Sequence, residues 1–587
     1  MTLPNRMLTP SVQRRVQRIG MMVAVAIGSL DAWFYGQWNL NPDGVSYLDI
    51  ARAIAERGLI EAINGYWSPL YPTALATALK MVQPTAEFQY PLVRFVGWLV
   101  FLCTTAAFAR LVRVSVEREP VASQMSDHAR AGATAVAWLL YLLLVVKAVG
   151  LFLATPDMGV AGFAFWIASE LILFTDEPWR TSRWARFGAV LAVGYWWKAI
   201  LFPVGAVALA IAAVVALRRR DSMRGPSVGG ISFVALALML AIPVSLHVQR
   251  PTFGETARLN QLWYVNGAPY VWSLCRPEDH DVRTDDLGVV AHDPVMTDGP
   301  LMCGFRSPSP GSTLPMWYDP SAYYRDAHAR PSITQMATTV RRDVRYLVDE
   351  LSVLAPVVAM LALILVAAAV VRGGWAAAWP ARVFALTPIA LYLAVYVELR
   401  HVAPFMLIGV LGALMTVVSR VPRAGRAVLA ILAIGCLVDI QRSISEQLLV
   451  RSLILGHQMR GEPSAEQVTA VVARELRARG FEAGDRVATI NSLWNVDWAQ
   501  RARLHVRAYA PEYTVSVVHT VAALYDACAR ARWATSLAAR GIAAVVLRQP
   551  TGLRVPAGFS PLGDTGYWVM SLRELTPESA CVSRGGG

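Results

Sequence analysis

Six ionisable residues stand beside long apolar segments and are of the types that group transfer uses. They are Asp43, Asp157, Lys198, Glu398, Arg400 and His401. A carboxylate can take a proton from an attacking hydroxyl, and cations can hold a phosphate that leaves as an anion. Ionisable residues next to a membrane are costly when they are unpaired, so they are a functional hypothesis by default. Gathered at one membrane surface, these groups would suit a lipid-linked phosphosugar.

Each of these residues also has a structural explanation, and the sequence leaves both open. Asp43 could simply cap the helix that follows it, because Asp is a common N-cap residue. The segment 155–157 could be an ordinary polar turn, and the long side chain of Lys198 could extend its amine to water. Glu398 and Arg400 could form an internal ion pair. What favours function is that all of them fall on the same predicted face.

The elements that must position these residues are membrane spans. Hydrophobic residues make up 55% of the chain and charged residues only 16%, whereas soluble proteins carry about 25% charge. Apolar runs near the length of a bilayer core predict eleven spans. They fall near 20–38, 90–112, 132–152, 158–174, 185–197, 199–217, 228–247, 347–371, 382–397, 402–419 and 427–440. The first is too long for a cleaved signal sequence and is interpreted as a retained anchor.

Arginine groups fix the predicted orientation. They precede the first span and follow the second, fourth, sixth, eighth and tenth, so all six lie on one side if the N-terminus is cytoplasmic. The net charge of +13 is thus explained by topology, and nucleic acid is not expected as a partner. Arginine and alanine are abundant while lysine is rare, which is typical of a GC-rich bacterial genome. We therefore expect a multi-pass protein of the bacterial cytoplasmic membrane.

Three pieces of the chain are then expected outside the cytoplasm: loops 39–89 and 248–346, both part of a membrane domain 1–440, and a tail 441–587. The tail alternates helical and strand patterns and predicts a small α/β domain. Its expected elements are helices 464–479 and 520–540 and strands 486–490, 543–547 and 567–572. The outer cysteines favour disulfides within each piece, Cys275 with Cys303 and Cys528 with Cys581.

Two motifs shape the first outer loop. The segment 45–57 has amphipathic spacing before Gly58, which predicts a helix lying in the membrane interface. The run Tyr66-Trp67-Ser68-Pro69-Leu70-Tyr71-Pro72 is rigid and aromatic. It could be part of an interfacial aromatic belt, or a wall that positions a sugar or a lipid headgroup.

The sequence resembles the integral-membrane glycosyltransferases of the GT-C superfamily, in particular bacterial members akin to protein O-mannosyltransferases and the lipid A aminoarabinose transferase. The resemblance covers roughly residues 20–440. It rests on Pro42-Asp43-Gly44-Val45-Ser46-Tyr47, Trp67-Ser68-Pro69-Leu70-Tyr71-Pro72, Thr155-Pro156-Asp157, Gly194-Tyr195-Trp196-Trp197-Lys198 and Glu398-Leu399-Arg400-His401. The last has histidine where the family has tyrosine. Many members also carry two adjacent acids in the first loop, whereas Gly44 follows Asp43 here.

The resemblance implies an α-helical GT-C-like bundle with a small extracytoplasmic α/β domain and an active site made by the outer loops. Asp43 would be the catalytic base and Asp157 a second acid, with Lys198 and Arg400 on the donor phosphate. The other expected substrate-binding residues are Glu398, His401, Tyr47, Trp67 and Tyr71. The donor would be a polyprenyl-phosphate-linked sugar, and the acceptor a lipid, glycan or protein hydroxyl. The cofactor is undetermined, a divalent metal included. The alternative is a lipid or polysaccharide transporter without covalent chemistry.

Overall fold

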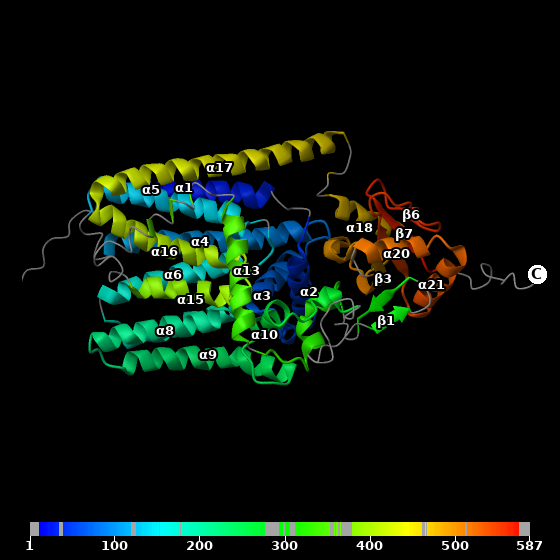
Figure 1. Cartoon of the computed structure of the whole chain (residues 1–587), viewed down its shortest axis with the longest axis horizontal. Coiled ribbons are helices and arrows are strands. Elements are labelled where there is room, and N and C mark those ends of the chain that lie inside the picture. The colour runs from blue at the N-terminus through cyan, green and yellow to red at the C-terminus, as the bar shows by residue number, and fades with distance from the viewer. Residues whose placement is uncertain are drawn as a thin grey trace, which may run out of the picture.

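The computed structural model describes residues 11–34, 39–118, 125–275 except 152 and 177, 293–296, 300–305, 311–352 except 331, 357, 360–361, 364–365, 379–460, 464, 467–510 and 514–573. A long helical bundle occupies one end of the molecule and a mixed α/β domain the other (Figure 1). Short helices lie between them and cover one end of the bundle. We call this end of the bundle the tail end.

The bundle consists of apolar helices lying side by side. Seven of the described helices are long and apolar enough to cross a membrane, which makes the chain a multi-pass membrane protein. Shorter or more polar helices, such as α7, accompany them. The bundle helices are α1 (Ser11–Phe34), α4 (Gln89–Arg118), α5 (Asp127–Leu143), α6 (Asp157–Asp176), α7 (Thr181–Trp197), α8 (Leu201–Arg218), α9 (Arg224–Val248), α15 (Trp379–Leu393), α16 (Leu399–Arg420) and α17 (Pro422–Met459).

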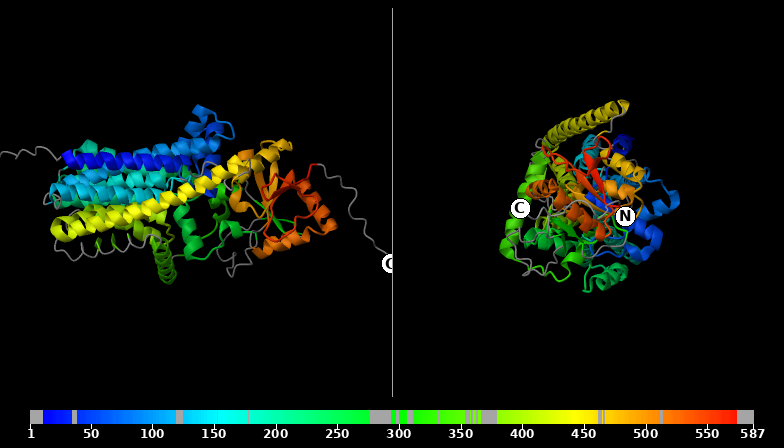
Figure 2. Two further views of the ribbon diagram at one scale, coloured as in Figure 1. Left: turned by 90° about the horizontal axis from the view of Figure 1, so that it is seen from above. Right: turned by 90° about the vertical axis from the view of Figure 1, so that its right-hand side faces the viewer.

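Two helices differ most in extent from the sequence-based expectation. The helix α17 continues to Met459, so the predicted end of the last span at 440 falls inside one helix that runs on toward the tail (Figure 2, left). Leucines continue along this extension, including the exposed Leu448 and Leu449. The amphipathic helix α13 (Ile333–Ser352) lies across the bundle (Figure 1) and takes up the start of the predicted span 347–371. Most of that span lies outside the described residues.

The first outer loop forms helices α2 (Pro42–Arg57) and α3 (Leu70–Val82). Pro42 occupies the first turn of α2, where its fixed φ and missing N–H are no handicap. Gly58 ends the helix with a φ of 104°, a conformation that disfavours other residues. The predicted helix and its stop are therefore present, but α2 is buried on most of its surface rather than lying half in water. It is enclosed by α3, α12 (Pro315–Tyr318) and α19 (Asp497–Ala502).

The tail domain is built on a seven-stranded sheet with strand order β1-β2-β4-β3-β5-β7-β6. Strand β3 runs parallel to both β4 and β5, and all other pairs are antiparallel. The crossovers between parallel strands need intervening helices. The elements are β1 (Asp293–Met296), β2 (Met302–Gly304), α18 (Val468–Ala478), β3 (Arg486–Ile490), α19, β4 (His505–Tyr509), α20 (Thr514–Ala523), α21 (Ala527–Ala539), β5 (Ala544–Arg548), β6 (Ser560–Pro561) and β7 (Tyr567–Ser571).

The sequence anticipated strands β3, β5 and β7 within one residue at each end. The single helix expected over 520–540 is instead two, because Asp526 caps a new helix by accepting a hydrogen bond from the Ala529 backbone N–H. Two strands of the sheet come from the second outer loop: Cys303 of β2 pairs with Tyr509 of β4. This loop and the tail therefore form one sheet, which the sequence did not predict.

The disulfide between Cys275 and Cys303 is present, with a Cα–Cα distance of 5.6 Å, as predicted. It ties the chain just after the short helix η5 (Val271–Ser273) to strand β2. Cys528 is also disulfide-bonded, and its predicted partner Cys581 lies outside the described residues. The second loop further contains α10 (Thr256–Asn260), and its chain folds back over the tail end of the bundle (Figure 1).

Candidate active site

The tail end of the bundle contains a cavity of about 360 Å³ that collects all six ionisable residues singled out from the sequence. They come from the first turn of α2, the start of α6, the corner between α7 and α8, and the start of α16. Apolar side chains of the bundle helices α8 and α15, among them Pro203 and Leu391, line one side of the cavity, which we call its membrane side. Residues separated by up to 358 positions in the printed sequence thus share one small space.

Arg400 lies at the centre of the charged cluster. Its Nη2 atom is 3.7 Å from Oδ2 of Asp43, and its Nη1 atom is 3.6 Å from Oδ2 of Asp157. Its Nε donates a hydrogen bond to Glu398. The distances to the two aspartates exceed those of a hydrogen bond. The terminal N–H groups of the guanidinium therefore lie near both aspartates but donate no hydrogen bond to either of them.

Asp43 is positioned by contacts from outside its own helix. The N-cap residue of α2 is Asn41, and Asp43 lies inside the first turn, so it is not the cap. Its Oδ1 accepts a hydrogen bond from the indole N–H of Trp317 at 3.0 Å. Trp317 is in turn fixed through its carbonyl oxygen, which accepts hydrogen bonds from Ser46 and Trp67 at 2.9 Å each.

The pKa of Asp43 is raised above that of an ordinary aspartate. Burial is the main cause, because it penalises the charged form. The Arg400 cation and the hydrogen bond from Trp317 oppose this effect, while the neighbouring Glu398 adds to it. A carboxylate with a raised pKa is a better proton acceptor when it is ionised, as a general base requires.

Gly44, which directly follows Asp43, is closely packed. A Cβ atom at this position would meet Cβ of Ala154 at 2.8 Å and Oδ1 of Asn41 at 2.9 Å. This close approach brings the start of α2 against the turn that precedes Asp157. A second carboxylate at position 44 has no room in this arrangement.

Asp157 and Lys198 form the other side of the cluster. Asp157 is buried at the first turn of α6, and the amine of Lys198 donates a hydrogen bond to it. Lys198 follows the last turn of α7 in an extended conformation. The preceding Trp197 donates its indole N–H to the carbonyl of Pro156 at 2.7 Å. The corner after α7 is thereby fixed to the turn before α6, and the two charges face each other.

Glu398 and His401 complete the cluster. Glu398 is the N-cap residue of α16, but its carboxylate accepts hydrogen bonds from Tyr396 and Arg400 rather than capping the helix. The ring of His401 stacks on Tyr392 with centroids 4.8 Å apart and 12° between the planes. The internal pair between Glu398 and Arg400 that the sequence allowed is thus present, within a larger network that reaches both aspartates.

These carboxylates do not form a metal-ligand set. Within the described ranges, no group of three or more His, Cys, Asp or Glu side chains is placed to hold a metal ion. Each of Asp43, Asp157 and Glu398 instead faces a protein cation. The residues present do not fit a divalent metal, and we assign it no step.

Aromatic side chains form the remaining wall. Tyr47 and Trp67 line the cavity with ring centroids 4.8 Å apart. Tyr71 does not line it but supports Tyr47 from behind, at 5.0 Å between centroids. The segment 66–72 is therefore a wall of the cavity at Tyr66 and Trp67, while its later part begins α3. Sequence reasoning missed further lining residues, namely Tyr264, Tyr270, Trp317, Tyr392 and Tyr396. Their only signal was the density of Trp and Tyr in the second outer loop and near Glu398.

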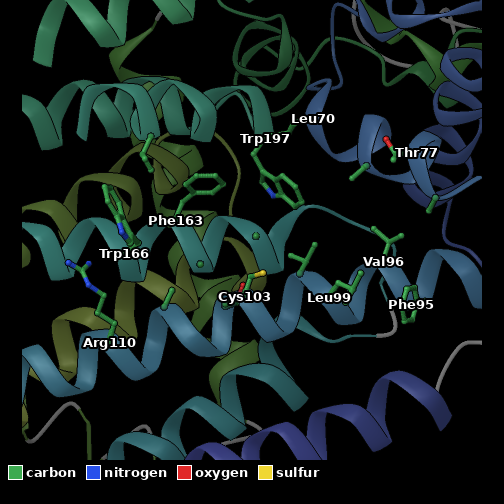
Figure 3. A pocket seen from close by; sticks show the side chains of 18 of the residues that line it. Leu70, Thr77, Phe95, Val96, Leu99, Cys103, Arg110, Phe163, Trp166 and Trp197 are labelled. Atoms are coloured by element: carbon green, nitrogen blue, oxygen red, sulfur yellow. The ribbon is translucent and has the colours of Figure 1, made fainter. Parts of the chain in front are cut away.

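A second, larger space of about 1090 Å³ runs along the bundle between α3, α4, α6 and α7. Figure 3 shows side chains from these elements pointing into it, including Leu99, Cys103 and Phe163. At its far end Arg110 forms an ion pair with Glu170 at 2.5 Å. Thr77 and Phe95 lie at its other end, and Trp197 lies between the two ends (Figure 3). We call this space the apolar groove; Lys198 and Arg400 do not line it.

No family model matches the chain, and no curated protein matches it in sequence. Among solved structures, the chain is similar to ArnT from Cupriavidus metallidurans bound to undecaprenyl phosphate, with 12% identity over 94% of this chain and 97% of that one and a TM-score of 0.43. It is also similar to the archaeal oligosaccharyltransferase AglB from Archaeoglobus fulgidus, in complex with an inhibitory peptide and a dolichol-phosphate. There the identity is 10% over 92% of this chain and 69% of that one, with a TM-score of 0.42. Both are GT-C glycosyltransferases.

Proposed function

We propose that the protein is a membrane glycosyltransferase that moves a sugar from a polyprenyl-phosphate donor to an acceptor hydroxyl. The observation that carries the proposal is the placement of Arg400, whose guanidinium lies between the half-buried carboxylate of Asp43 and the buried carboxylate of Asp157. Only its Nε donates a hydrogen bond to a described residue. Because arginine has five N–H donors, the remaining ones can bind phosphate oxygens, and Lys198 adds a second cation on the same wall.

In the proposed reaction Asp43 takes the proton from the acceptor hydroxyl. The acceptor oxygen then forms a bond to the anomeric carbon, and the bond from that carbon to the phosphate oxygen breaks. The phosphate oxygen keeps the bonding electrons, and Arg400 and Lys198 offset the negative charge that develops on it. Displacement in one step would invert the anomeric centre. Asp157 holds both cations in place, since its carboxylate contacts each of them.

The membrane side of the cavity supports a lipid-linked donor. With the phosphate at Lys198 and Arg400, the chain of the donor would leave past Phe202, Pro203 and Leu391, between α8 and α15. Apolar side chains there offer a polyprenyl chain direct access from the bilayer. With the N-terminus in the cytoplasm, as the arginine groups predict, the site would face the outer side of the cytoplasmic membrane.

The proposal is tested by binding and by turnover in nanodiscs. We expect Lys198→Ala and Arg400→Ala each to weaken binding of undecaprenyl phosphate about 10- to 100-fold, because each removes a charge-assisted contact. Lys147→Ala is the matched control, since Lys147 pairs with the exposed Glu446 outside the cavity. Unchanged undecaprenyl phosphate affinity in both cavity variants would contradict the proposal. A transporter would move lipid-linked sugars across vesicles without forming a glycosylated product.

A further inference from the structure

We propose that a third cavity, which Asp43 also lines, is the acceptor site and binds a pyranose ring, so that the acceptor is a glycan. This inference rests on the proposed function and specifies its acceptor. The cavity has a volume of about 520 Å³, and we call it the aromatic cavity. Its lining includes Asn41, Trp263, Tyr270, Trp272, Trp317 and Trp494.

The position of the aromatic cavity identifies it as the place of the attacking hydroxyl. Asp43 and Glu398 line both this cavity and the one that contains Lys198 and Arg400. A base must lie between the group that it deprotonates and the carbon that this group attacks. With the donor phosphate on one side of Asp43, the acceptor belongs on the other.

Trp317 lines both the charged cavity and the aromatic cavity. Its indole N–H holds Asp43, and its ring lies 5.3 Å from the ring of Trp272 and 5.8 Å from that of Tyr270. The residue that orients the base is thus also part of the wall against which an acceptor would lie. A ring bound on this wall would bring its hydroxyls within reach of the carboxylate.

The chemistry of the wall selects the class of acceptor. Aromatic rings carry negative charge on their faces, so they attract the polarised C–H groups on the face of a pyranose. The hydroxyls around the edge of such a ring need polar partners, and Asn41, Asp43 and Glu398 provide them at one end of the cavity. A lipid chain would not use these polar groups. An extended peptide would need backbone hydrogen-bonding partners that an aromatic wall lacks.

The tail domain contributes Trp494 to this wall. Trp494 lies in the short helix η8 (Leu493–Asn495), directly after the carboxyl end of β3. Its ring lies 4.2 Å from that of Trp272, yet its side chain is 49% exposed. Strand β3 lies between β4 and β5, and the carboxyl end of such a central parallel strand is where open α/β sheets bind ligands. An exposed tryptophan at this point gives the tail a role in recognising the acceptor.

The test uses the full chain in nanodiscs and a panel of soluble probes, namely linear oligosaccharides of glucose, mannose and galactose, with serine- and threonine-containing peptides for comparison. Binding is followed by saturation-transfer NMR. We expect at least one oligosaccharide to bind, and Trp494→Ala to weaken this binding about tenfold, which is the loss of one aromatic contact. Trp494→Phe should restore most of the affinity. Trp568→Ala is the control, because Trp568 lies in the same domain and bonds Gln549 away from the cavity.

Binding of undecaprenyl phosphate is measured on the same samples and should be the same in Trp494→Ala as in the wild type. The inference is overturned if no oligosaccharide binds, if peptides bind instead, or if Trp494→Ala and Trp568→Ala behave alike. In each of these cases the donor measurements still decide the proposed function separately, because they depend on Lys198 and Arg400 rather than on Trp494.

Discussion

The indole N–H of Trp317 donates a hydrogen bond to Oδ1 of Asp43 at 3.0 Å across 274 positions of sequence. One residue comes from the first outer loop and the other from the second, so the proposed base is oriented by a segment that folds over it. The hydrogen bond stabilises the ionised form of Asp43 and lowers its pKa against the effect of burial. This relationship gives a prediction on the pH dependence of the reaction.

Trp317→Phe should shift the acidic limb of the pH profile to higher pH. Without the hydrogen bond the carboxylate loses a contact that favours its charge, so its pKa rises and a higher pH is needed to ionise it. The measurement is kcat/KM for transfer between pH 4 and pH 8. A profile that falls at all pH values without moving along the pH axis would mean that Trp317 acts only through packing.

Asp43→Asn should leave the fold intact and reduce transfer about 100-fold or more, because it removes the proton acceptor. Asn is almost isosteric and can still accept a hydrogen bond from Trp317. The control is Glu56→Gln on the exposed side of the same helix. Normal activity in a folded Asp43→Asn protein would refute Asp43 as the base.

Leu391→Trp should impair long-chain donors more than short ones. Leu391 lines the membrane side of the charged cavity, where the donor chain is proposed to leave. A larger side chain there would obstruct the chain but not the phosphate. The KM of an undecaprenyl-linked donor should rise several-fold while that of a two-isoprene analogue changes little.

Cys103→Trp provides the matched comparison for the donor path. Cys103 lines the apolar groove of Figure 3, which Lys198 and Arg400 do not line. Filling this groove should leave both donors unaffected. If Cys103→Trp and not Leu391→Trp discriminated between chain lengths, the donor chain would lie in the apolar groove instead.

The stability of the tail end should increase as the pH falls from 7 to 5. Asp49 is 4% exposed, and burial raises its pKa to about 6. The folded state therefore binds a proton more tightly than the unfolded state, and the stabilisation is lost as the pH rises through about 6. The full effect of this shift is about 3 kcal/mol.

The measurement is the apparent Tm at pH 7 and pH 5 for the wild type and Asp49→Asn. Asp49 accepts hydrogen bonds from the backbone and side chain of Thr313 at 2.6 and 3.0 Å, so it joins the two outer loops. The wild type should gain more on acidification than the variant. Equal gains would show that other groups are responsible for the pH dependence.

The sequence was most informative where a local signal sufficed. The end of α2 at Gly58 is a short-range feature that the sequence predicted, although the helix begins at Pro42 rather than at 45. The charges flanking the spans gave the cluster around Arg400. The sheet shared by the second outer loop and the tail could not be predicted, because β2 is three residues long and pairs with β4 some 200 positions later. No local pattern encodes such a pairing.

The aromatic cavity was missed for a related reason. Trp272, Trp317 and Trp494 are far apart in sequence, and each could equally have been a core residue or part of an interfacial belt. Their convergence depends on how the second loop and the tail fold together. The length of α17 was underestimated because the apolar span was expected to end at 440, whereas the helix continues past it through Arg442 and Glu446, which form an ion pair one turn apart.

The pairing of β2 with β4 has a consequence for biogenesis. Strand β2 leaves the ribosome about 200 residues before β4, and all the described helices from α13 to α19 are made in between. The shared sheet can close only when the last segment of the chain has been made and folded. Until then the aromatic cavity lacks Trp494, whereas the cavity around Lys198 and Arg400 is lined only by residues that precede the tail. A nascent or truncated chain would therefore hold the proposed donor residues without a complete acceptor wall.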